Sequence, residues 1–144
     1  MKSRSINPDI PRNLKFVKSL KPFFKGRQEI LLVFLFGSFA SRRIRPSSDV
    51  DIGILYKTIP DIDAINAVTA ELSSVLQREV DLVVLNQASP ILKMQILKKG
   101  ILLYAVGRKY FSQFFTDTVN QYDDLKRIRK SCEENILKGR IYAR

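Results

Sequence analysis

The feature that most constrains the fold of this chain is a run of seven apolar residues, Ile30 to Phe36, followed by Gly37 and Ser38. The length of the run and its aromatic and β-branched residues predict a β-strand that is buried on both faces. Seven residues are too few to span a bilayer, which takes about 20 apolar residues in a helix. The run therefore predicts a core strand of a soluble protein without a membrane segment.

Strands and helices are both predicted in the rest of the chain. Three more strands are expected, at Val50–Tyr56, Val80–Leu85 and Ile101–Tyr104. Helices are expected at Leu14–Lys21, where Pro22 would end the helix, and at Ile62–Arg78, Pro90–Lys99 and Arg108–Lys138. Together these elements predict an α/β (α+β) fold, a small mixed sheet of about four strands with flanking helices.

Capping residues support the two middle helices. Asp61 is a candidate N-cap for the first of them, and Ser89 followed by Pro90 fits the cap and first turn of the second, which Gly100 would stop. The first of these helices is expected to turn one apolar side to the core, made of Ile62, Ile65, Val68, Leu72, Val75 and Leu76.

The last predicted helix, Arg108–Lys138, contains no Pro or Gly. Apolar or small residues recur in it every three or four positions, at Phe111, Phe115, Thr118, Tyr122, Leu125, Ile128, Cys132 and Ile136. This spacing predicts one long amphipathic helix, or two, whose basic second half extends beyond what so small a sheet can cover. Either the helix packs only on its own domain or its free part docks on a second protein.

Cys132 is the only cysteine of the chain, so an internal disulfide is impossible and a cytoplasmic location is expected. Because it lies in a helical stretch, Cys132 is expected to be a small buried hydrophobic residue rather than a reactive thiol. The N-terminus is basic but interrupted by prolines, and it lacks the continuous apolar segment of a signal peptide.

The net charge of +11 comes from the two ends of the chain, with 25 Lys and Arg against 14 Asp and Glu in total. Residues 1–28 hold eight basic residues and one acid, and residues 126–144 hold seven and two, whereas 29–125 is nearly neutral. We expect residues 1–28 to form a basic extension and 29–144 to form the domain. The basic ends are either solvated or attracted to a polyanion, such as nucleic acid or an acidic partner.

The absence of histidine limits the chemistry that the chain can perform. Ser-His-Asp and Cys-His catalysis and His-ligated zinc are excluded, which leaves carboxylates and a metal held by oxygen atoms. Ten residues after Ser38, the chain enters a predicted strand through Asp49 and Asp51, whose side chains share a face. Two close carboxylates favour Mg²⁺ or Mn²⁺ between them, together with substrate phosphates that Gly37 and Ser38 could cradle.

Asp81, at the start of another predicted strand, would complete a cluster of three carboxylates. Such a cluster can hold two metal ions, polarise a triphosphate and activate an attacking hydroxyl group. If Asp49 and Asp51 are committed to metal, Asp81 is the natural base toward that hydroxyl.

The pattern of Gly37-Ser38, ten residues and Asp49-x-Asp51 resembles the signature of the DNA polymerase β-like nucleotidyltransferases. It is most similar to their minimal members, the MNT-type antitoxins that are paired with HEPN-domain toxins. The resemblance covers residues 30–138 and implies the polymerase β-like nucleotidyltransferase fold. It also implies that Asp49, Asp51 and Asp81 are metal-binding catalytic carboxylates, and that Gly37 and Ser38 hold the phosphates of ATP.

These antitoxins transfer AMP from ATP to a tyrosine of the partner toxin, an RNase, and so silence it. In one respect this sequence departs from its relatives, which often carry an Arg and then a Gly shortly after the Gly-Ser pair. Ser41 and Arg42 stand at those positions, so Arg42, Arg43 or Arg45 would supply the phosphate contact. Two further functions stay open, a module that neutralises the toxin by contact through its last helix, and nucleotidyl transfer to RNA or a small hydroxyl compound.

Overall fold

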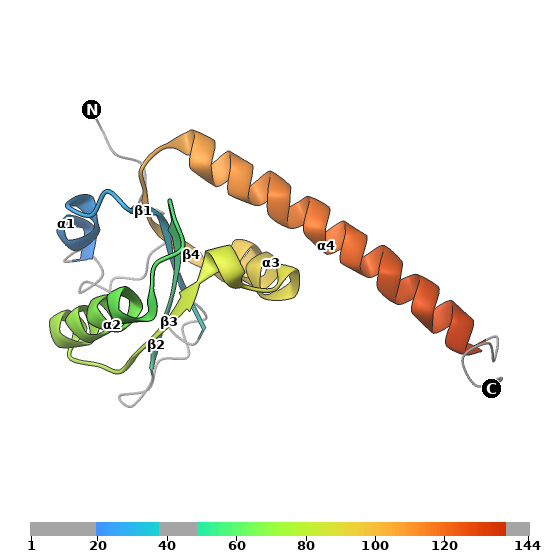
Figure 1. Cartoon of the computed structure of the whole chain (residues 1–144), viewed down its shortest axis with the longest axis horizontal. Helices are drawn as coiled ribbons and strands as arrows, with labels where there is room; N and C mark the ends of the chain where they lie inside the picture. Colours follow the sequence, from blue (N-terminus) through green and yellow to red (C-terminus); the bar gives the residue numbers. More distant parts are fainter. Residues whose placement is uncertain (1–19, 38–48, 138–144) are drawn as a thin grey trace.

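The computed structural model describes residues 20–37 and 49–137, with side chains up to residue 134 (Figure 1). Its elements in chain order are α1 (Leu20–Lys25), β1 (Ile30–Phe36), β2 (Val50–Tyr56), α2 (Ile62–Leu76), β3 (Val80–Val84), the short 3-10 helix η2 (Leu85–Gln87), α3 (Pro90–Lys99), β4 (Ile101–Ala105) and α4 (Arg108–Leu137). All four predicted strands are confirmed, and so are the caps by Asp61 and Ser89, whose side chains accept from the N–H groups of Ala64 and Leu92.

The four strands form one mixed sheet in the order β3-β2-β1-β4. β1 pairs antiparallel with both β2 and β4, whereas β2 and β3 run parallel. The crossover between the parallel strands is α2, as the rules for such connections require. The predicted mixed sheet of about four strands with flanking helices is therefore confirmed.

β1 is buried on both faces, as its apolar run predicts. Val33 and Leu35 belong to a core between the sheet and helices α1 and α2. Leu32 and Phe34 belong to a second core on the opposite face, under α3 and the first half of α4. All four side chains are at most 2% exposed. The sheet is thus the middle layer of three, with helices on both sides (Figure 1).

The predicted end of the first helix at Lys21 is wrong, because α1 continues through Pro22 to Lys25. A proline near the start of a helix removes an N–H group that has no partner within the helix, so it does not interrupt it. Leu20 and Phe24 of α1 are fully buried. The described part of the predicted N-terminal extension therefore contributes to the core of the domain, and residues 1–19 lie outside the described residues.

Three other predictions, two about α2 and one about β3, need correction. The predicted apolar side of α2 is too wide, because Ile62 and Val75 are 71% and 46% exposed and only Val68, Leu72 and Leu76 are buried. α2 also ends two residues early, where Gln77 adopts a left-handed conformation (φ 54°) and caps the helix. β3 ends at Val84 because the chain turns into η2.

α4 is a single helix of 30 residues, which settles the choice between one helix and two. Its first half packs on α3 and the sheet, and its second half runs past both into solvent (Figure 1). Cys132 lies on this second half and is exposed, so the expectation of a buried cysteine is wrong. None of the helices in the described part of the chain is long and apolar enough to cross a membrane.

Candidate active site

Three predicted site residues meet at one edge of the sheet, where β1 ends and β2 and β3 begin. Asp51 lies opposite Phe36 of β1 on one side and opposite Asp81 of β3 on the other. Because residues in register on neighbouring strands share a face, the side chains of Asp51 and Asp81 lie on the same side of the sheet. Asp49, two residues before Asp51, shares that side and is exposed just outside the strand.

Gly37 brings the end of β1 against the Asp51 carboxylate. Its φ of +75° lies in the left-handed region, which residues with a side chain rarely adopt. A Cβ atom built on Gly37 would stand 2.0 Å from Oδ2 of Asp51 and 2.9 Å from its Cγ. The absence of a side chain at position 37 is therefore what lets the carboxylate occupy its place. Residue spacing pointed to Gly37 as a phosphate contact but did not reveal this packing role.

The electrostatics of the edge centre on Asp51, the most enclosed of the three carboxylates. Partial burial, followed by repulsion from Asp81 and then from Asp49, raises the pKa of the Asp51 carboxyl group above its ordinary value of 3.8. Each of these causes disfavours the charged form. A cation placed among the carboxylates would offset the repulsion between them.

The oxygen atoms at this edge suit a hard divalent cation in their chemistry but not in how closely they are gathered. All three side chains offer only oxygen atoms, the ligands that Mg²⁺ and Mn²⁺ prefer. Within residues 20–37 and 49–134, however, no group of three or more acidic, His or Cys side chains is gathered closely enough to hold a metal ion. Mg²⁺ is commonly bound by one or two carboxylates together with substrate phosphates, so the in-register pair Asp51 and Asp81 still fits that mode.

The remaining predicted site residues are Ser38, Arg42 and Arg43, with Arg45 as an alternative phosphate contact. They lie outside the described residues, as does the whole segment 38–48. Their predicted contacts with the phosphates of a nucleotide therefore stay predictions. What the structure does describe is the two ends of this segment, Gly37 and Asp49, which both lie at the carboxylate edge.

A second polar cluster, which the sequence did not suggest, joins α3 to α4. Lys93 is only 8% exposed and donates a hydrogen bond of 2.6 Å from Nζ to Oε1 of Gln121. Burial lowers the pKa of Lys93, and the nearby Asp117 carboxylate partly opposes this shift. These residues line a hollow of about 290 Å³ with Leu31 and Leu55, at the opposite end of the sheet from Asp51 and Asp81. We assign the cluster to the attachment of α4 and not to the carboxylate edge.

The raised pKa of Asp51 predicts that its negative charge lowers the free energy of unfolding at neutral pH. Because the folded state holds the Asp51 proton more tightly than the unfolded state, stability falls as the pH rises from 3.8 through the folded pKa. We expect Asp51→Asn to raise the melting temperature at pH 7 in EDTA, by roughly 1–4 °C for a like-charge pair worth about 0.2–1 kcal/mol. The gain should disappear toward pH 3.

Thermal unfolding at both pH values measures this effect, with Asp63→Asn as the matched control. Asp63 is an exposed acid in the first turn of α2, where its charge favours the helix. Its removal should leave stability unchanged or lower it slightly, especially in a chain whose net charge is already +11. A lower melting temperature for Asp51→Asn at pH 7 would contradict the repulsion among the three carboxylates.

Known proteins resemble this chain in both sequence and fold. The profile of the family described as "Polymerase beta, Nucleotidyltransferase" matches residues 18–109. The chain is 29% identical over 110 residues to the protein adenylyltransferase MntA of Shewanella oneidensis, which covers 76% of this chain and 78% of that protein.

Solved structures of toxin–antitoxin complexes are similar as well. One was crystallised with AMP-PNP; its matching chain is 27% identical, with a TM-score of 0.70 over 88% of this chain and 99% of that chain. Another holds the tri-AMPylated HEPN toxin of S. oneidensis with its MNT antitoxin, at 26% identity and a TM-score of 0.67 over the same shares.

Proposed function

Because the chain belongs to the polymerase β nucleotidyltransferase family and is homologous to the MntA antitoxins, we propose that it transfers AMP from ATP to a tyrosine hydroxyl group of a partner HEPN toxin, an RNase, and so neutralises it. The observation that carries the proposal is the in-register pair Asp51 and Asp81, flanked by Asp49 and packed against Gly37. The described edge thus combines the carboxylates that nucleotidyl transfer needs with a turn at Gly37 against which the Asp51 carboxylate packs.

The transfer makes one bond and breaks one. The tyrosine oxygen attacks the α-phosphorus of ATP, and the bond from that phosphorus to the oxygen bridging to the β-phosphate breaks, so that pyrophosphate leaves. Asp81 is exposed at the start of β3, where an incoming hydroxyl group can reach it. We assign to it the role of the base that accepts the tyrosine proton. Gly37 and Ser38 would bind the phosphates through backbone N–H groups and a hydroxyl group.

Asp49, Asp51 and Asp81 would hold Mg²⁺ only together with the phosphates of ATP, with two ions as the expected number and Mn²⁺ as a substitute. When bound, the metal would stabilise the charge that develops on the phosphate oxygens. The chain's own contribution is to fix the carboxylates before substrate arrives. Asp51 is held between two neighbouring strands and against the turn at Gly37, so its position is set by the fold.

Incubation of the protein with the toxin, ATP and Mg²⁺, followed by intact mass spectrometry of the toxin, tests the proposed transfer directly. We expect a shift by one or more AMP units and a matching loss of RNase activity. Replacement of the acceptor tyrosine by Phe should abolish the shift. An unmodified and active toxin, in a mixture where the two proteins bind, would refute the transfer. Labelled ATP with RNA or small hydroxyl compounds tests the other acceptors.

Neutralisation by contact alone is the second candidate function. The projecting half of α4 favours it, because a helix that leaves its own domain offers a surface to another protein. The two candidates differ in their need for ATP. If the toxin is neutralised equally well without any nucleotide, contact is sufficient and the carboxylates serve another purpose.

A further inference from the structure

One face of α4 holds side chains at heptad spacing, apolar at both ends and polar at Thr118 and Gln121 in the middle, and it continues beyond the domain. Its positions alternate in steps of three and four, at Phe111, Phe114, Thr118, Gln121, Leu125, Ile128 and Cys132. This 3.5-residue period is the spacing by which one helix packs along another. We call the last three residues, Leu125, Ile128 and Cys132, the projecting seam.

The first half of this pattern is occupied by the chain's own domain. Phe114 is 6% exposed and its ring lies 5.8 Å from that of Phe34, and Thr118 is fully buried. Gln121 receives the hydrogen bond from Lys93 of α3. α3 is therefore part of what covers the face, and it shows what kind of element this face accepts.

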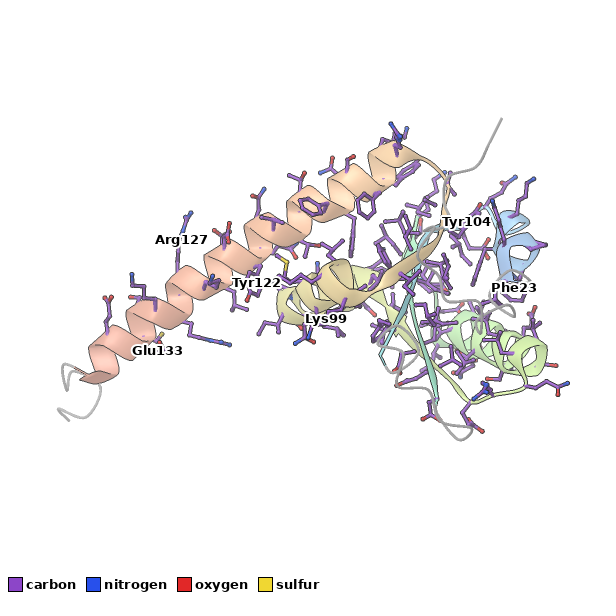
Figure 2. All side chains as sticks on the ribbon, turned by 180° about the vertical axis from the view of Figure 1, so that it is seen from behind. Phe23, Lys99, Tyr104, Tyr122, Arg127 and Glu133 are labelled. Carbon is purple, nitrogen blue, oxygen red and sulfur yellow. The ribbon has the colours of Figure 1, made fainter. Side chains whose placement is uncertain are left out.

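The described residues cover the second half of the pattern much less, and Leu125 alone is half-buried there. Ile128 is 62% exposed, and Cys132 is exposed as well. Both views show α4 running on past α3 and the sheet, with Arg127 and Glu133 on the free part (Figure 2). A helix as short as the free part of α4, from Leu125 to Leu137, would be marginal in water on its own, and the exposed Asp124–Arg127 pair at 3.9 Å adds little stability. The projecting seam is thus an apolar stripe in the register of a helix pair, for which residues 20–37 and 49–137 supply no second helix.

The charges around the seam favour an acidic partner over a second copy of this chain. Four cations flank Ile128 at the centre of the seam, namely Lys126, Arg127, Arg129 and Lys130, whereas the acids of this stretch stand at its two ends, at Asp123, Asp124, Glu133 and Glu134. Two copies packed seam against seam at Ile128 would bring eight cations together, which is repulsive. A partner helix with carboxylates beside its apolar stripe would meet the same cations favourably.

We propose that the projecting seam of α4 docks on an α-helix of the HEPN toxin that carries an apolar stripe flanked by acidic residues. This inference rests on the proposed function for the identity of the partner, and similar chains have been solved in complex with such a toxin. The toxin helix continues along α4 in the role that α3 has on its first half. The seam would hold the toxin while the carboxylate edge modifies it.

The test is Ile128→Glu, measured by isothermal titration calorimetry against the toxin. We expect the affinity to fall by at least about 30-fold, as for a central interface residue. The matched control is Ile62→Glu, which places the same charge on an equally exposed isoleucine of α2 and should bind like the unmodified protein. Because Ile128 is exposed, both variants should melt at the temperature of the unmodified protein, which excludes a folding defect.

Cys132 provides an independent readout, since it is the only cysteine of the chain. Maleimide labelling of Cys132, followed by mass spectrometry, should be fast for the free protein and strongly slowed in the complex. If Ile128→Glu binds the toxin with unchanged affinity, and Cys132 is labelled as fast in the complex as in the free protein, the proposed docking through the seam is wrong. The proposal would also be overturned if light scattering detected a dimer of the toxin-free protein and the Ile128→Glu variant were monomeric. In that case a second copy of the chain would occupy the projecting seam.

The seam and the proposed transfer can fail separately. A toxin that binds through the seam but receives no AMP refutes the transfer and leaves the seam intact. If Ile128→Glu binds the toxin with normal affinity and transfers AMP to it at the normal rate, docking through the seam is refuted and the proposed transfer is not.

Discussion

Replacement of Asp49 and Asp51 by Ala together is expected to lower the rate of AMP transfer to the toxin by at least about 10³-fold. Charge stabilisation at a transferring phosphoryl group is worth several kcal/mol, and each 1.36 kcal/mol is a tenfold change in rate. Asp51 is the carboxylate that the fold holds most firmly, between Phe36 and Asp81 and against Gly37. Initial rates of toxin modification, followed by intact mass, measure the loss.

Unfolding cannot account for this loss. The pKa of Asp51 is raised by burial and by repulsion from its two neighbours, so the removal of its charge relieves a cost in the folded state. The double variant should therefore melt no lower than the unmodified protein in the absence of metal. It should also bind the toxin with unchanged affinity, because the seam on α4 lies on another part of the molecule.

Asp63→Asn serves as the control for the loss of a negative charge and should retain full transfer. If the double variant transfers AMP within tenfold of the normal rate, the carboxylate edge is not the active site. If instead it transfers nothing but still neutralises the toxin completely, contact is the function and transfer is secondary.

Local sequence determines much of this fold. The apolar run Ile30–Phe36 could be recognised as a doubly buried strand because it needs no knowledge of its neighbours. The caps Asp61 and Ser89 were predictable for the same reason, since a capping side chain bonds the backbone three residues away. The Asp-x-Asp pattern likewise predicted that the carboxylates of Asp49 and Asp51 share a face, although Asp49 lies just outside β2.

What escaped prediction depends on contacts between distant segments. Helical spacing marked Ile62 and Val75 as core residues, but how much of α2 is covered depends on the width of the sheet below it. Cys132 was expected to be buried, because the sequence does not say where the domain under α4 ends. Likewise, that Asp81 starts a strand could be predicted, whereas its direct register with Asp51 is fixed by the parallel pairing of β2 and β3.

The contact between Gly37 and Asp51 is the least predictable part of the site, and Gly37→Ala tests it. We expect this variant to lose about 100-fold in the rate of AMP transfer, a loss that a 1 Å displacement of a catalytic group can cause. The added methyl group would overlap the Asp51 carboxylate, with 2.0 Å to Oδ2, and the carboxylate is the part that can move away. The left-handed φ adds about 1–3 kcal/mol of strain, so stability falls as well.

A matched control and a double-mutant cycle separate the clash from the strain. Gly26→Ala adds the same methyl group where no atom of another described residue lies within 4 Å, and it should change neither stability nor rate by much. In an Asp51→Ala background the two nearest atoms are gone and only Cβ remains, at 3.2 Å. Gly37→Ala should therefore cost less stability there than in the unmodified protein, as measured by urea unfolding. Equal costs in both backgrounds would show that backbone strain alone requires glycine at position 37, and that the Asp51 carboxylate does not rest against it.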